Sequence, residues 1–110
     1  MDSTTALAAF AALGQPIRLD VVRLLIKAGP EGMTAGRIGE ALQVRQNTLS
    51  ANLLVLRNAG LIASEREGRS IRYRADFEGL SGLLHFLLED CCGGDPALCR
   101  PLIDDIACCG

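Results

Sequence analysis

Tryptophan is absent from the 110-residue sequence, and aromatic residues of all kinds make up only 4% of it. A folded core must therefore be built from leucine, isoleucine, valine and alanine, which dominate a hydrophobic fraction of 49%. That fraction is high enough to bury a core of ordinary size, which argues against intrinsic disorder. The length leaves room for one compact domain and little else.

Long apolar segments are missing as well. No stretch approaches the roughly 18–20 uncharged apolar residues that a membrane-spanning helix needs. The beginning of the chain, residues 1–5, lacks the basic and apolar parts of a secretory signal. We therefore expect a cytoplasmic protein with no membrane partner.

Histidine occurs once, as His85, and cysteine is confined to one end of the chain. All five cysteines follow residue 90: Cys91, Cys92, Cys99, Cys108 and Cys109. A disulfide framework would use an even number of cysteines spread across the fold. Clustered thiols in a chain without an export signal favour metal, metalloid or redox chemistry over a purely structural role. A lone histidine is more typical of a packed or surface residue than of a metal ligand.

Charge is unevenly distributed, although the net charge is only −2. Between residues 45 and 74, six arginines oppose two glutamates, which gives +4. From residue 76 to the end, seven acidic residues oppose one arginine, which gives −6. A basic middle beside an acidic end fits a surface that faces phosphates, but many other proteins share this asymmetry.

Helical signals cover the chain up to residue 60. The first predicted helix is rich in alanine, is capped by Ser3, Thr4 or Thr5 and ends near Gly14. The second begins at Pro16 and is ended by Gly29-Pro30. A third helix is predicted over residues 35–42, where Thr34 is the N-cap and the inward residues are Ile38, Ala41 and Leu42. A fourth is predicted over residues 46–58, where the inward residues are Leu49, Leu53 and Leu56 and Gly60 ends the helix. Two strands are then predicted over 61–66 and 70–75, followed by an amphipathic helix from residue 77 to about 91.

This order of short helix, three-residue turn, longer helix and β-hairpin is that of a winged helix-turn-helix, here over roughly residues 34–76. In that fold the second helix enters the major groove of DNA, and the hairpin lies against the neighbouring backbone. Asparagine and glutamine bond adenine edges, whereas hydroxyl groups and arginines mainly serve phosphates. The residues predicted to contact DNA are Arg45, Gln46, Asn47, Thr48, Ser50, Asn52, Arg66, Arg69 and Arg72.

Three other interpretations compete with DNA binding. The polar helix face could simply be solvated, as in any small α+β domain. The winged fold could also serve as a protein-interaction module. An enzyme such as a small thiol reductase is the third, but the sequence lacks Cys-x-x-Cys and any βαβ pattern, so we expect no enzyme.

Residues 12–19, 42–53, 56–62 and 66–73 resemble the ArsR/SmtB metalloregulators, and the resemblance extends over about residues 6–90. It implies a mainly α-helical winged helix-turn-helix with a β-hairpin wing, and a homodimer formed by the first and last helices. The implied function is that of a transcriptional repressor that leaves double-stranded operator DNA when an inducer binds. Residues 1–92 would form the DNA-binding and dimerisation domain, and residues 93–110 a cysteine-containing tail. Asn52 stands where the family often has a histidine, which leaves the base preference open.

The inducer sites of that family can be compared with this chain residue by residue. Its arsenic site on the helix before the recognition helix needs Cys-x-Cys, but residues 32–37 contain no such ligand. Its zinc and nickel site on the last helix needs paired histidines, and His85 has no second histidine to pair with. Some arsenite-responsive members carry cysteines after the last helix, and this chain is similar to them there. We therefore expect arsenite, a trivalent arsenic species, as the inducer ligand, bound by Cys91, Cys92 and Cys99.

Adjacent cysteines on a continuous helix point ~100° apart, so the Gly93-Gly94 pair matters because it would end the helix and free Cys92 to turn. Cys108 and Cys109 would be a spare pair or a second site. Other interpretations stay open for the same thiols. Antimonite or methylated arsenic could be the inducer, structural zinc would want four ligands in separated pairs, and a disulfide could form a redox switch.

Overall fold

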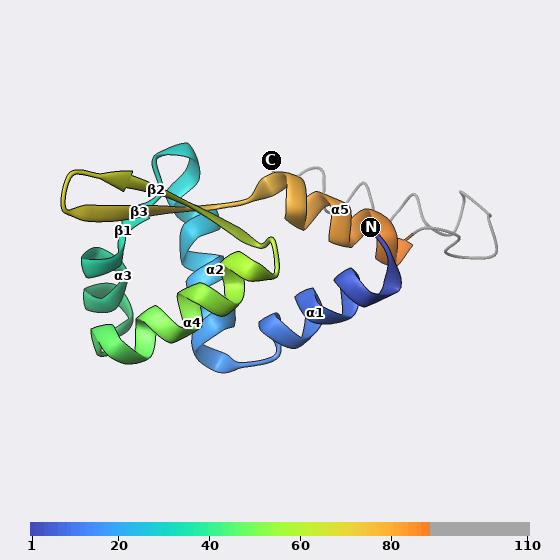
Figure 1. Ribbon diagram of the computed structural model, residues 1–110, viewed down its shortest axis with the longest axis horizontal. Coiled ribbons are helices and arrows are strands. Elements are labelled where there is room, and N and C mark those ends of the chain that lie inside the picture. The colour runs from blue at the N-terminus through green and yellow to red at the C-terminus, as the bar shows by residue number, and fades with distance from the viewer. Residues whose placement is uncertain (89–110) are drawn as a thin grey trace.

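The structure, a computed structural model, describes residues 1–88 (Figure 1). Its elements in chain order are α1 (Ser3–Leu13), α2 (Pro16–Ala28), the 3-10 turn η1 (Gly29–Glu31), β1 (Met33–Thr34), α3 (Ala35–Leu42), α4 (Gln46–Asn58), β2 (Ile62–Glu67), β3 (Ser70–Ala75) and α5 (Phe77–Leu88). This mainly helical arrangement with an antiparallel hairpin confirms the predicted winged helix-turn-helix. No helix among residues 1–88 is long and apolar enough to cross a membrane.

The first helix begins one to three residues earlier than its expected caps imply. Asp2, rather than one of the three hydroxyl residues that follow it, caps α1 by accepting a hydrogen bond of 2.8 Å from the backbone N–H of Thr5. This bond stabilises the carboxylate and lowers the pKa of Asp2 below its usual value. An aspartate caps a helix as well as serine does, so the local sequence alone offered several equivalent candidates.

The core is aliphatic and lies where α2 meets α3, α4 and the start of the hairpin. The largest fully buried side chains are Val21, Leu25, Ile38, Leu49, Leu53, Leu56, Leu61 and Ile62. The three leucines of α4 are thus buried as predicted, and they hold one face of that helix against the body. Ala41 is the exception among the expected inward residues of α3, because its side chain is exposed.

The wing contains a third strand that the sequence did not predict. β1 pairs antiparallel with β3, so the sheet order is β1-β3-β2, with Met33 opposite Tyr73. Two residues are too few to show the alternation that identifies a strand. Their pairing requires Gly32, because a Cβ there would lie 2.1 Å from the carbonyl oxygen of Tyr73.

Helix α4 ends in a Schellman motif, which sets where the wing starts. Gly60 adopts a φ of +78°, as expected for a left-handed residue. The N–H of Leu61 donates to the carbonyl of Leu56, and that of Gly60 donates to the carbonyl of Arg57, at 3.1 and 3.0 Å. The chain thereby reverses and enters β2 beside the helix that it has just left.

The first and last helices pack against each other at one end of the described residues, opposite the tip of the hairpin (Figure 1). Within α5, Leu83 is buried, whereas Leu84 and Leu87 are 44% and 56% exposed. On α1, Leu7 is 67% and Phe10 39% exposed. The two helices therefore present apolar side chains that the single chain does not cover.

Candidate nucleic-acid interface

The turn between α3 and α4 is built on a glycine. Gln43 ends α3 in the left-handed region with a φ of +55°, and the N–H of Val44 donates to the carbonyl of Gly39 at 3.0 Å. A Cβ on Gly39 would lie 2.3 Å from Nε2 of Gln46 and 3.1 Å from the oxygen of Val44. A side chain at this position would therefore displace the Gln46 amide from its place against α3.

Gln46 connects the two helices of the motif. Its Nε2 donates a hydrogen bond of 3.2 Å to the carbonyl of Ala35, in the first turn of α3. The side chain is exposed, so its oxygen can still accept a hydrogen bond from a partner. Gln46 thus sits at the predicted site and also holds the start of α4 in place.

The first turns of α4 present polar side chains to solvent. Arg45, Asn47, Thr48 and Ser50 are all exposed. The helix has no acidic residue in its first turn and no side-chain hydrogen bond from its N-cap residue, Arg45. Its N-terminal N–H groups and dipole therefore favour a negatively charged partner such as a phosphate.

Asn52 is placed differently from the other predicted contacts of α4. Its side chain is half-buried, and its Oδ1 accepts a hydrogen bond of 3.1 Å from Nη1 of Arg18. Its Nδ2 donates to the carbonyl of Thr48 at 3.0 Å. Sequence reasoning gave Arg18 no role, because nothing in the spacing of α2 shows that one of its arginines reaches α4.

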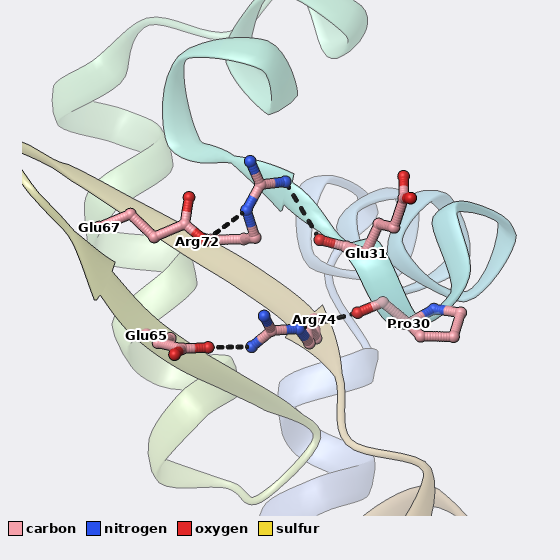
Figure 2. Close-up of polar contacts among 6 residues, drawn as sticks. All are labelled: Pro30, Glu31, Glu65, Glu67, Arg72 and Arg74. Atoms are coloured by element: carbon pink, nitrogen blue, oxygen red, sulfur yellow. Dashed lines mark hydrogen bonds and ion pairs between the residues drawn. The ribbon is translucent and has the colours of Figure 1, made fainter.

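Two arginines brace the wing from β3, as Figure 2 shows. Nε of Arg72 pairs with Glu67 at 2.9 Å, and its Nη1 donates to the carbonyl of Glu31 at 3.1 Å. Arg74 repeats the arrangement with Glu65 at 2.7 Å and with the carbonyl of Pro30 at 2.8 Å. Each guanidinium therefore joins β2, β3 and η1.

These pairs follow from the register of the hairpin. Glu65 lies directly opposite Arg72, but the ion pairs run along the diagonal, from Arg72 to Glu67 and from Arg74 to Glu65. Arg72 is therefore engaged within the wing, whereas the predicted contacts Arg66 and Arg69 are exposed beside the turn. Among residues 1–88, the only ion pairs are those of Arg72 and Arg74.

The predicted metalloid ligands cannot be placed. Cys91, Cys92 and Cys99, and the additional pair Cys108 and Cys109, lie outside the described residues. Among residues 1–88, no three histidine, cysteine, aspartate or glutamate side chains gather as a metal site would require. His85 is exposed on the last turn of α5.

Comparison with known proteins supports the helix-turn-helix. Residues 13–65 match the family described as "Helix-turn-helix domain". The chain is 42% identical over 62 residues to the HTH-type transcriptional regulator NmtR of Mycobacterium tuberculosis, a match covering 56% of this chain and 49% of that protein. The chain spans about half the length of the curated relatives it matches.

Solved structures extend the match beyond the motif. An ArsR-like transcriptional regulator from Rhodococcus sp. RHA1 superposes with a TM-score of 0.72 at 28% identity, over 94% of this chain and 93% of that one. The chain is thus similar to ArsR-like transcriptional regulators over nearly its whole length. The matched proteins are themselves described as transcriptional regulators.

Two more solved structures are similar to this chain. The homodimeric winged helix-turn-helix DNA-binding domain of a Mycobacterium bovis protein has a TM-score of 0.64 at 27% identity, covering 79% of this chain and 81% of that one. A protein described as "Possible transcriptional regulator for arsenical resistance" has a TM-score of 0.62 at 28% identity, covering 70% and 77%.

Proposed function

We propose that this chain is a homodimeric, cytoplasmic transcriptional repressor that binds operator DNA and is released when trivalent arsenic binds Cys91, Cys92 and Cys99. The observation that carries the DNA-binding part is the exposed polar start of α4, which follows the helix-turn-helix turn directly. Asn47, Thr48 and Ser50 are available to bases and phosphates there, and Arg66 and Arg69 on the wing are available to the backbone.

A dimer fits this assignment because one recognition helix reads only a short site. The exposed apolar side chains of α1 and α5 lie at the end opposite the wing tip, so a two-fold contact there leaves both recognition helices free. A symmetric dimer would read two half-sites of an imperfect palindrome. The homodimeric relative from Mycobacterium bovis supports this assembly.

The arsenic part rests on the five cysteines that follow residue 90. Trivalent arsenic is a soft acceptor for thiolates, so three cysteines suffice to hold it. The similar protein described in connection with arsenical resistance favours the same inducer. Ligand and DNA would prefer opposite arrangements of the dimer, and moving such an equilibrium from 1:99 to 99:1 takes about 5.5 kcal/mol of differential binding.

The test is release of a labelled duplex, measured by fluorescence anisotropy with the full chain. The duplex is one enriched by the wild-type protein from a randomised pool. Arsenite should release the wild type, and Cys99→Ser should need at least roughly tenfold more arsenite, because one of three thiolates is lost. The matched control is Cys108→Ser, which should respond as the wild type does. Equal release of wild type and Cys99→Ser would contradict the three-cysteine site.

A second candidate keeps the repressor and replaces the inducer. The adjacent pair Cys91 and Cys92 offers two thiols, which suffice for monomethylated trivalent arsenic or for redox chemistry. The same assay run with antimonite, methylated arsenic, zinc, cadmium and peroxide separates these inducers. Release by peroxide that a thiol reductant reverses, with no release by arsenite, would favour the redox switch.

A further inference from the structure

We infer that Arg18 and Asn52 form a clamp that fixes the orientation of the recognition helix α4, so that Asn52 positions this helix instead of reading a base. The inference rests on the proposed DNA-binding function. It assigns a role to Arg18, and it changes the role that the sequence suggests for Asn52.

Arg18 spans the end of α1 and the middle of α4. Its Nε donates to the carbonyl of Ala12, in the last turn of α1, at 2.7 Å, and its Nη1 donates to Oδ1 of Asn52 at 3.1 Å. Its backbone N–H donates to Oε1 of Gln15, the N-cap residue of α2, at 2.9 Å. A planar guanidinium presents several donors in a fixed fork, so it suits two acceptors on different helices.

Each end of the Asn52 amide already makes one hydrogen bond within the protein. Reading adenine with an asparagine takes one donor and one acceptor from the same amide. Here the acceptor is bonded to Arg18, and the donor is bonded to the carbonyl of Thr48. Asn52 is also half-buried, unlike Asn47 and Ser50, which are exposed. Base readout by Asn52 would therefore have to use the remaining N–H and lone pair of a half-buried side chain whose orientation these two bonds fix.

The clamp supplies what apolar packing does not. Leu49, Leu53 and Leu56 bury one face of α4, but hydrophobic contacts are non-directional and tolerate small rotations. A hydrogen bond at the edge of that face is directional and restricts rotation about the helix axis. Because Arg18 is bonded to α1 as well, the orientation of α4 is tied to the helix that carries exposed Leu7 and Phe10. A dimer that covers these residues would thus contact the same helix to which Arg18 is bonded.

A double-mutant cycle tests the clamp. Arg18→Ala, Asn52→Ala and the double variant are compared for binding to the selected duplex, to each of its single-base-pair variants and to an unrelated duplex. Each single variant should bind the selected duplex roughly tenfold more weakly than the wild type does. The double variant should bind about as tightly as either single variant, because both substitutions remove the same interaction. In these variants, the preference for the selected duplex over its single-base-pair variants should fall by a similar factor at every base pair. Arg23→Ala, which removes an exposed arginine of the same helix, corrects for the lost charge.

Three results would overturn the clamp: additive losses, loss of preference at a single base pair in Asn52→Ala alone, or wild-type affinity in Arg18→Ala. Thermal unfolding of the same four proteins supplies a readout without DNA, in which the two substitutions should again be non-additive. If the wild type binds no duplex while the unfolding cycle is non-additive, the proposed function fails and the clamp stands. Arg18→Lys keeps the charge but cannot present the guanidinium fork, and it replaces Arg18→Ala if that variant does not fold.

Discussion

At the scale of single residues, two glycines determine how closely the backbone segments of this fold approach one another. A Cβ on Gly32 would lie 2.1 Å from the carbonyl oxygen of Tyr73 in β3, and a Cβ on Gly79 would lie 1.9 Å from the carbonyl oxygen of Gly60. Other glycines have room for a side chain, because no atom lies close to the position of a Cβ. Gly36, in the first turn of α3, has nothing within 4 Å of the position where a Cβ would stand.

Gly32 and Gly36 make a matched pair for a stability prediction. Gly32→Ala should lower the free energy of unfolding by about 3 kcal/mol, because it combines a φ of +63° with a clash against the backbone of Tyr73. Gly36→Ala should be neutral or stabilising by up to about 1 kcal/mol, since alanine favours a helix. Urea denaturation followed by circular dichroism measures both. Equal destabilisation by the two substitutions would show that the close contact between Gly32 and Tyr73 does not require a glycine.

Residue-scale features also mark the limit of sequence reasoning. Thr34 and Gly60 were predictable because a helix cap and a left-handed stop depend on residues close by in the chain. Their structural roles are confirmed. The bond from Arg18 to Asn52 joins residues 34 positions apart, so it depends on how the helices pack, which no local pattern encodes. The same applies to Arg72, whose partners Glu67 and Glu31 come together only in the folded wing.

At the scale of elements, the wing divides into a braced base and an exposed tip. Arg72 and Arg74 tie β3 to β2 and η1 (Figure 2), whereas Arg69 follows Gly68 in the turn and is exposed. Exposed ion pairs contribute little individually, but here each arginine also bonds a backbone carbonyl of η1. The base of the wing is therefore held to the body, and the tip is free to meet a phosphate.

This division predicts different salt dependence for two arginines of equal charge. For Arg69→Ala, the slope of log affinity against log salt should be shallower by about 0.9 for each protomer in contact with DNA, because one phosphate contact is lost. Arg74→Ala should leave the slope nearly unchanged, because its guanidinium is engaged with Glu65 and Pro30. Titrations of the selected duplex at several salt concentrations measure both slopes. The same change of slope in both variants would contradict the idea that only the tip of the wing contacts phosphates.

At the scale of the whole molecule, the sequence predicts only part of what α1 and α5 contribute. Their existence follows from helical periodicity, but the extent of their apolar exposure does not, since it depends on how much of each helix the rest of the chain covers. Leu83 faces inward, while its neighbour Leu84 is 44% exposed. A small body with few aromatic residues cannot cover both faces of such a helix. The uncovered face is what a second copy would bury.

The proposed dimer can be tested separately from DNA contact. Leu84→Glu should raise the dissociation constant of the dimer about 100-fold, because symmetry removes two leucine contacts of at least about 1.5 kcal/mol each and leaves two charges to be buried. Leu54→Glu is the control, since Leu54 is 50% exposed on α4, within the proposed DNA-facing helix. Leu54→Glu should stay dimeric in sedimentation and lose affinity for the selected duplex. Leu84→Glu should become monomeric and lose that affinity because the two half-sites are no longer linked. A Leu84→Glu protein that remains dimeric would place the interface elsewhere.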